Sequence, residues 1–221
     1  MKYYPMFLRV AGWRCLVVGG GQVGEQKAAA LLKAEARVTV ISPEATPTIL
    51  QWASTHTIDY QPRCYRRGDV RGFRLAFAAT GDEQIQQQLQ REAREAGVLL
   101  NVVDRPERCD FIVPSVVEQG DLIVATSTSG ASPALARRIR RELQESFGPE
   151  YAQALQLLRR LRQRLKGHVE SPAERQRILN DLVNSPLLSY LRQRQIHAID
   201  RLLAATAGEG VSLASLGMEL S

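Results

Sequence analysis

The glycine-rich run Gly19–Gly24 is the part of this sequence whose spacing most clearly indicates a chemical role. It fits the pattern G-x-G-x-x-G, follows an apolar stretch typical of a strand and precedes an alanine-rich stretch typical of a helix. In such a turn Gly19 permits the tight bend, Gly21 lets a pyrophosphate approach the backbone, and Gly24 lets the helix pack closely on the strand. The helix N-terminus then faces the phosphates. The run predicts a dinucleotide site; a purely structural glycine turn is the alternative.

The residues after the second expected strand bear on which dinucleotide would bind. Many such sites place an Asp or Glu at the end of this strand, where the carboxylate holds the ribose. Here Ile41 is followed by Ser42, Pro43 and Glu44, and no arginine follows immediately to receive a 2′-phosphate. Ser42 offers a hydroxyl, and Glu44 offers a carboxylate from the adjoining loop. The sequence therefore favours NAD over NADP.

Asp104 is the candidate for acid–base chemistry. It follows the apolar stretch Val98–Val103, which predicts a strand. Ligands of open α/β sheets bind at the carboxyl ends of the strands, and a carboxylate there could serve as a general base. The alternative is a turn aspartate before Arg105-Pro106, a common use of Asp in loops.

Alternating strands and helices in the first half of the chain must position these residues. Strands are expected at 14–18, 37–41, 57–60, 74–79 and 98–103, and helices at 23–34 and 83–96, the last one ending at Gly97. Continuous apolar strands that alternate with helices are typical of a parallel sheet covered on both faces. The expected fold class is therefore α/β, with a Rossmann-type parallel sheet over residues 1–110.

The second half of the chain has a different character. Residues 111–114 and 121–126 resemble strands, a serine- and glycine-rich loop follows, and helices are expected from Pro133 to residue 207. We therefore expect a small second part over 111–147 and a helical domain over 148–221. The segment from Gly208 is small and polar, which predicts a flexible tail.

Composition excludes several classes of protein. Of the 221 residues, 44% are hydrophobic and 24% are charged, as in ordinary globular proteins. No apolar run approaches the roughly 18 residues of a membrane span, and the N-terminus lacks the features of a signal peptide, so we expect a cytoplasmic protein. The three cysteines and three histidines are not spaced as metal ligands, and we expect neither a disulfide framework nor a resident metal.

The positive charge of the chain is concentrated in one stretch. Residues Pro133–Lys166 hold nine basic and three acidic side chains, an excess that equals the formal charge of +6 of the whole chain. Such a stretch attracts polyanions, either nucleic acid or a small molecule with many carboxylates; a solvated helix face is the plainer alternative. It lacks interleaved aromatic residues and any known DNA-binding motif, so we expect no nucleic-acid partner.

Five stretches together resemble the precorrin-2 dehydrogenase and sirohydrochlorin ferrochelatase family, which also forms the N-terminal module of siroheme synthases. They are Tyr4–Leu8, Cys15–Gly24 with Lys27, Phe77–Thr80, Asn101–Asp104 with Phe111–Ser115, and Ser127–Arg137. Their order and spacing agree with the family over residues 1–165. The chain ends where a fused synthase would continue into its methyltransferase module, which indicates a stand-alone form.

The resemblance implies an NAD-dependent oxidation of precorrin-2 to sirohydrochlorin, with Asp104 as the catalytic residue. The residues expected to contact the cofactor are Gly19, Gly21, Gln22, Val23, Gly24, Ser42, Pro43, Glu44, Thr80, Asn101 and Val102. Those expected near the tetrapyrrole substrate are Thr128, Ser129, Gly130 and Arg137. It also implies a homodimer, with the 111–147 segment supplying dimer contacts and part of the substrate cleft. Thr128 replaces a serine of many relatives, and Gly130-Ala131 replaces a more glycine-rich pair.

Two questions stay open in the sequence. Some members of the family also insert Fe²⁺ to give siroheme, whereas others that share these motifs only dehydrogenate. An NAD-sensing regulatory domain is the alternative function, since it would share the glycine turn. Such a domain would not need Asn101–Asp104 or the serine-rich loop.

Overall fold

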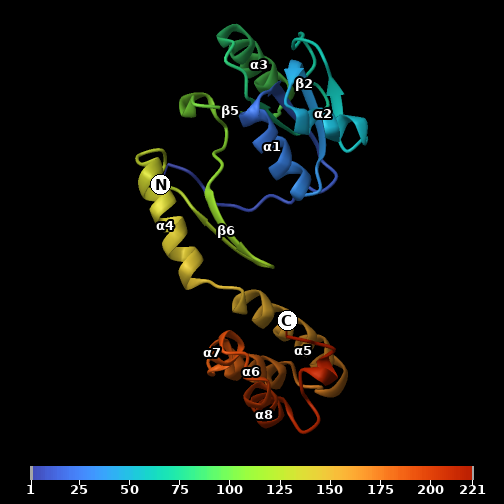
Figure 1. Ribbon diagram of the computed structural model, residues 1–221, viewed down its shortest axis with the longest axis vertical. Coiled ribbons are helices and arrows are strands. Elements are labelled where there is room, and N and C mark those ends of the chain that lie inside the picture. Colours follow the sequence, from blue (N-terminus) through green and yellow to red (C-terminus); the bar gives the residue numbers. More distant parts are fainter. Residues whose placement is uncertain (1, 221) are drawn as a thin grey trace. The chain divides into compact units, whose positions relative to one another are not determined.

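The structure is a computed structural model that describes residues 2–220 (Figure 1). It divides into two compact units between Val113 and Pro114.

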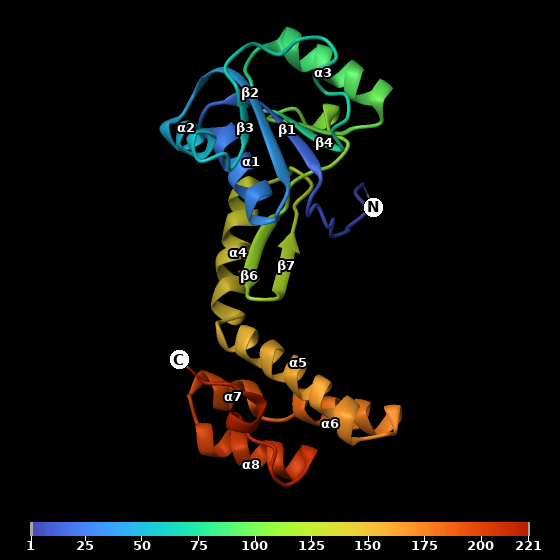
Figure 2. The same cartoon turned by 90° about the vertical axis from the view of Figure 1, so that its right-hand side faces the viewer.

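The first unit is a parallel sheet with helices on both faces (Figure 2). Its elements are β1 (Arg14–Gly20), α1 (Gln22–Lys33), β2 (Arg37–Ala45), α2 (Pro47–Ser54), β3 (Asp59–Gln61), β4 (Leu75–Ala78), α3 (Glu83–Ala96), β5 (Leu99–Val102) and the 3₁₀ turn η1 (Pro106–Arg108). The strand order is β3-β2-β1-β4-β5, and all neighbours pair in parallel. The expected α/β class with a Rossmann-type parallel sheet is confirmed.

The two faces of the sheet follow from the alternation of side chains along each strand. In β1, Cys15 and Val17 pack in the apolar cluster that includes α1 and α2, whereas Leu16 and Val18 pack in the cluster that includes α3. All four side chains are buried. A strand that is apolar on both sides is therefore covered on both sides, which holds the carboxyl ends of the strands at one edge of the sheet.

Local signals set the ends of α3. The Asp82 carboxylate accepts hydrogen bonds from the backbone N–H groups of Gln84 and Ile85, and it thereby satisfies donors that the first helical turn leaves free. At the other end Gly97 adopts the left-handed conformation with φ 67°, which glycine adopts without strain. Both ends were expected from the sequence.

The second unit begins with a hairpin and continues in helices. Its elements are β6 (Ser115–Gln119), β7 (Leu122–Thr126), α4 (Pro133–Ser146), α5 (Glu150–His168), α6 (Pro172–Val183), α7 (Leu187–Arg192), α8 (Ile196–Ala207) and the 3₁₀ turn η2 (Ala214–Leu216). β6 and β7 pair antiparallel. Helices α4 and α6 each have a serine N-cap followed by proline, a pair that favours helix starts.

The prediction of a strand at 111–114 is wrong. These residues precede the first hairpin strand, which starts at Ser115. Phe111 instead belongs to the first unit: its ring lies edge-on to Phe77 with centroids 5.5 Å apart, and its carbonyl accepts a hydrogen bond from Asn101. Pro114 has no N–H to donate to a ladder. The apolar run therefore serves as a connection that returns to the sheet.

The C-terminal segment also differs from the expectation of a flexible tail. Val211, Leu213, Leu216 and Met218 are buried in the same core as the helices of this unit. Arg160 on α5 donates to the carbonyl oxygen of Leu216 at 2.8 Å. These four apolar residues are two or three positions apart in the sequence, and they fill the core although the residues between them are mostly small or polar.

None of the helices within residues 2–220 is long and apolar enough to cross a membrane.

An ion pair between a buried carboxylate and an exposed guanidinium joins α5 to α7. Glu150 is only 4% exposed, and Arg192 donates to its Oε1 atom from Nε at 3.0 Å. Burial raises the pKa of the Glu150 carboxyl, but hydrogen bonds from Arg192 and the backbone outweigh it, and the pKa lies below its ordinary value. The ionised form of Glu150 therefore stabilises the fold.

Replacing Arg192 with glutamine is expected to lower the melting temperature at neutral pH, because the buried carboxylate loses its cation. A depressed pKa contributes stability above the ordinary value, and that stability is lost as pH falls through the folded-state pKa. The difference in melting temperature between wild type and Arg192→Gln should therefore narrow below about pH 4.5. Circular dichroism melts over a pH series measure this. Arg177→Gln, which removes an exposed pair with Glu174, is the control and should change little.

Candidate functional site

Close packing around the turn between β1 and α1 requires three of its glycines. Gly19 has φ 116°, and a Cβ atom there would lie 2.4 Å from the Ala79 carbonyl oxygen. A Cβ atom on Gly24 would lie 2.0 Å from the Gly19 carbonyl oxygen. On Gly20 it would lie 2.3 Å from the Glu44 carbonyl oxygen. The turn is therefore pressed against the ends of β2 and β4 and against α1, as expected for Gly19 and Gly24.

Gly21 differs, because a Cβ atom there would meet nothing within 4 Å. Its φ of −74° suits any residue, so neither packing nor strain requires glycine at this position. Gly21 is the N-cap of α1, and the first helical residues Gln22 and Val23 follow it. Open space before the free N–H groups of a helix N-terminus fits a pyrophosphate. The site therefore suits a dinucleotide.

The end of β2 lies beside this turn. The strand continues to Ala45, whereas the sequence predicted its end at Ile41, so Glu44 belongs to the strand and not to a loop. Its continuation follows from a register shift in β1 between Val18 and Gly20, which pairs Gly20 with Ala45. Ser42 is buried, while Pro43 and Glu44 are exposed. Both Ser42 and Glu44 lie next to the backbone of Gly20.

The ends of β4 and β5 complete this edge of the sheet. Thr80 follows β4, and its N–H lies 3.0 Å from where a Gly19 Cβ atom would be. Asn101 and Val102 are buried at the end of β5, and Asn101 donates from Nδ2 to the Phe111 carbonyl oxygen at 2.9 Å. Both residues thus have structural roles, and their contact with a cofactor stays a prediction.

Asp104 lies in the turn that follows β5. Its side chain is exposed, and its backbone adopts a left-handed conformation with φ 60°. Asp and Asn are among the few residues other than glycine that tolerate this conformation. The preceding N–H, of Val103, donates to the Ala78 carbonyl oxygen at 3.0 Å, which fixes the start of the turn to β4. Asp104 therefore shares the carboxyl edge of the sheet with Thr80 and the glycine turn.

The residues expected near the substrate lie in the second unit, in the loop before α4. The Thr128 hydroxyl donates to the Ser132 carbonyl oxygen at 3.2 Å and accepts from the Ser132 N–H at 3.3 Å. Ser129 and Gly130 both have positive φ, of 53° and 85°. Arg137 is exposed on α4. Hydrogen bonds between Thr128 and Ser132 thus hold the loop in a defined turn. Its role in substrate binding remains a prediction.

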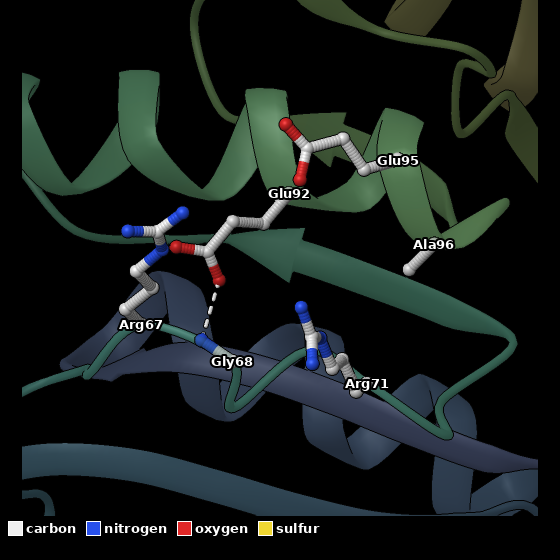
Figure 3. Close-up of a pocket in the computed structure, with 6 residues that line it drawn as sticks. All are labelled: Arg67, Gly68, Arg71, Glu92, Glu95 and Ala96. Carbon is white, nitrogen blue, oxygen red and sulfur yellow. Dashed lines mark hydrogen bonds between the residues drawn. The ribbon is translucent and has the colours of Figure 1, made fainter.

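A cavity of about 300 Å³ lies elsewhere in the first unit (Figure 3). Arg67, Gly68 and Arg71 line one side and the C-terminal turns of α3 line the other. The carboxylate of Glu92 accepts from the Gly68 N–H at 2.7 Å and from the Tyr65 hydroxyl at 2.9 Å. These bonds outweigh the effect of burial and lower the pKa of Glu92. The residues precede β4 and β5, so the cavity is at the amino end of the sheet, away from the candidate site.

Residues 2–220 contain no group of three or more Cys, His, Asp or Glu side chains placed to hold a metal ion.

Sequence reasoning missed the residues that hold the Asp104 turn, namely Glu83, Cys109 and Asp110. Cys109 and Asp110 bond to the backbone of β5, and Glu83 pairs with Arg108. The sequence carries no signal for these bonds, because they depend on β5 being the last strand of the sheet. The scattered spacing of the three cysteines indicated isolated thiols, and it gave no sign that Cys109 bonds to the backbone of β5.

Three family models match the chain, one after another. A model described as "Putative NAD(P)-binding" matches residues 6–115, "Sirohaem biosynthesis protein central" matches 119–146, and "Sirohaem synthase dimerisation region" matches 150–206. The dimerisation description thus falls on the helices after α4, C-terminal to the 111–147 segment for which sequence analysis predicted dimer contacts.

Curated proteins whose sequences are similar to this chain are described as siroheme synthases. The chain is 34% identical to that of Methylococcus capsulatus over 207 residues, which is 94% of this chain and 44% of the relative. It is 40% identical to that of Nitrosococcus oceani over 169 residues, which is 76% of this chain and 36% of the relative. The chain therefore spans less than half the length of these relatives.

A solved structure described as "SirC, precorrin-2 dehydrogenase" has a similar fold. The TM-score is 0.79 at 22% identity, and the match covers 93% of this chain and 99% of that chain. At this identity the likeness concerns the fold.

Proposed function

This chain belongs to the siroheme synthase family, and from that premise we propose that it oxidises precorrin-2 to sirohydrochlorin with NAD. When bound, NAD would supply the hydride acceptor for this oxidation, and a base of the protein would take the proton that the macrocycle releases. The tetrapyrrole, the cofactor and the acid–base residue must therefore meet at one place.

One observation carries the proposal: the glycine turn and Asp104 lie at the same edge of one sheet. Gly19 contacts the end of β4, and the start of the Asp104 turn is hydrogen-bonded to β4 on its other side. The residues along this edge would hold a dinucleotide whose pyrophosphate binds at Gly21. Asp104, which is exposed, would then face the substrate as general base.

The glycine turn, Ser42 and Glu44 would hold the NAD. The N-terminus of α1 suits the pyrophosphate. Glu44, whose backbone carbonyl lies against Gly20, is exposed, and its carboxylate would favour a ribose hydroxyl over a 2′-phosphate. We propose that Arg137 binds substrate carboxylates, because guanidinium groups bind carboxylates with two hydrogen bonds.

Incubation of the purified protein with precorrin-2 and NAD tests the proposal directly. Ultraviolet–visible spectra should show NADH and sirohydrochlorin appearing together, in equal amounts. A reaction without NAD is the control. Binding of NAD without any turnover would contradict the enzymatic proposal and favour an NAD-sensing domain.

Iron insertion is the second activity that we propose for this site. Insertion of Fe²⁺ as a substrate displaces two pyrrole N–H protons, and the exposed carboxylate of Asp104 is suited to accept protons in both steps. Anaerobic addition of Fe²⁺ to sirohydrochlorin, without NAD, should then give siroheme faster than the enzyme-free reaction. Equal rates would make the protein a dehydrogenase alone. Faster insertion that survives Asp104→Asn would separate the two activities.

We propose that the protein acts as a homodimer. Within α4 no residue is buried, and Val116, Ile123 and Leu135 are 41%, 47% and 48% exposed. An antiparallel hairpin with exposed apolar side chains needs a partner surface. Light scattering at micromolar concentration should give the mass of a dimer.

Replacing Ile123 with aspartate should shift this mass toward the monomer, because a charge would enter the apolar contact. Leu50→Asp is the matched control, since Leu50 is 49% exposed but lies in the first unit. A wild-type protein that remains monomeric would contradict the proposal.

A further inference from the structure

β5, the strand that precedes the Asp104 turn, is the last one in its sheet, so one of its edges has no neighbouring strand. The N–H groups of Leu99 and Val103 donate to carbonyl oxygens in and beside β4, at Arg74 and Ala78. Since neighbouring residues of a strand direct their backbone groups to opposite sides, Leu100 and Val102 present theirs at the outer edge. Unpaired groups there would be costly or would recruit another strand.

The chain seals this edge with the segment that returns from Asp104. The N–H of Leu100 donates to the Asp110 carboxylate at 2.9 Å, and the N–H of Asp110 donates to the Leu100 carbonyl oxygen at 2.8 Å. The groups of Val102 are bonded by the thiol of Cys109 and by the N–H of Arg105. Two side chains and two backbone N–H groups thus take the place of a sixth strand.

The Cys109 thiol closes the loop on which Asp104 lies. The N–H of Val102 donates to Sγ at 3.2 Å. The single thiol proton lies between the carbonyl oxygens of Val102 and Arg105, which are 3.2 and 3.3 Å from Sγ. Val102 and Arg105 enclose the turn that contains Asp104. Burial raises the pKa of the Cys109 thiol, which keeps the donated proton in place.

Glu83 makes a second set of contacts with this loop, through Arg105 and Arg108. Glu83, in the first turn of α3, accepts a hydrogen bond from Arg108 Nη2 at 2.6 Å, and Arg105 lies 3.6 Å from its other carboxylate oxygen. Glu83 and its partners are partly exposed, so this pair contributes modestly. The half-buried thiol differs from this pair because it bonds to backbone atoms on both sides of the left-handed turn, and it therefore constrains the backbone of Asp104 directly.

We infer that Cys109 is a positioning residue: its thiol holds the turn between Val102 and Arg105 in the conformation that presents the Asp104 carboxylate to the substrate. This rests on the proposed function of Asp104. The thiol itself does not touch the reacting atoms. Its removal displaces the Asp104 carboxylate, whereas the glycine turn after β1 lies outside the bonds that the thiol makes.

Three variants test the inference. Cys109→Ala should lower kcat about tenfold, because a catalytic group displaced by a fraction of an ångström loses much of its effect. The NAD dissociation constant should stay within about twofold, since the glycine turn is unaffected. Cys109→Ser keeps a donor and an acceptor at the same place and should restore most of kcat. Cys64→Ala, at the exposed free cysteine, is the control and should match wild type.

A double-mutant cycle separates positioning from general damage. If Cys109 acts through Asp104, Cys109→Ala should cause no further loss of kcat in an Asp104→Asn background. An additional tenfold loss there would contradict the inference. A wild-type kcat for Cys109→Ala alone, with Asp104→Asn inactive, would overturn it while leaving the role of Asp104 intact. An active Asp104→Asn would instead overturn the proposed function.

Hydrogen exchange gives a readout that does not depend on activity. In Cys109→Ala, the amides of Val102 and Arg105 should exchange faster, whereas those of β1 and α1 should keep their protection. Unchanged protection at Val102 would show that the thiol does not hold the loop, and would contradict the inference.

Discussion

Replacing Asp104 with asparagine is expected to lower kcat for precorrin-2 oxidation by about 100-fold or more, the usual contribution of a general base. Asparagine retains the size of the side chain and tolerates the left-handed backbone with φ 60°, so the variant should fold and melt as wild type does. Asp104→Ala would add strain at this position and would confound the comparison.

The measurement needs kcat, the NAD dissociation constant and the melting temperature on the same preparation. Loss of kcat with the other two unchanged assigns the effect to the carboxylate. Asp121→Asn is the matched control, because Asp121 is an exposed aspartate in the hairpin that pairs with Arg159. A variant at position 104 with wild-type turnover would remove Asp104 from the mechanism.

Replacing Gly21 with valine is expected to weaken NAD binding by about 10- to 100-fold and to lower the melting temperature only slightly, because valine is a poorer N-cap than glycine. The added side chain meets no protein atom, since nothing lies within 4 Å of a Cβ atom there. It would occupy the space in which the pyrophosphate approaches the helix N-terminus, and such overpacking costs about 1–3 kcal/mol. Calorimetric titration with NAD measures the affinity.

Two other glycines provide the contrast. Gly24→Val should destabilise the protein, because its Cβ atom would lie 2.0 Å from the Gly19 carbonyl oxygen. Gly167→Val, in open space on α5, should change neither stability nor NAD affinity much. Wild-type affinity in Gly21→Val would mean that the dinucleotide does not bind at this turn.

Regular features of the first unit were accessible from the sequence because local and tertiary preferences agree there. The strand before the glycine turn is apolar on both sides, and both sides are buried. Asp82 and Gly97 mark the ends of α3 with local chemistry that needs no partner. The role of Gly24 follows from the motif, and the structure places its α-carbon where a side chain cannot fit.

Other features depend on partners that are distant in the sequence. The continuation of β2 through Pro43 follows from the register shift opposite Gly20, which no local pattern encodes. Phe111 was expected in a strand, because its apolar neighbours do not reveal that its ring packs on Phe77. The tail after Gly208 has small residues around a few apolar ones, and only the folded helices provide the core that buries them.

Only part of the candidate site could be predicted from the sequence. Asp104 follows a recognisable strand, so its place at the carboxyl edge could be predicted. The role of Cys109 could not, because a lone cysteine looks the same in sequence whether it fills space or bonds to the backbone. The difference arises from the position of β5 as the last strand of the sheet.

The sealed edge of β5 has a consequence for synthesis of the chain on the ribosome. Asp110 follows Val102 by only eight positions, so the residues that close the edge emerge almost together with the strand. At translation rates of 5–20 residues per second, the edge is bare for less than about 2 s. The opposite edge strand, β3, spans only Asp59–Gln61 and offers little to a neighbour. Nascent chains on one messenger RNA can therefore pair through a free β5 edge only briefly, and through the β3 edge over only a few residues.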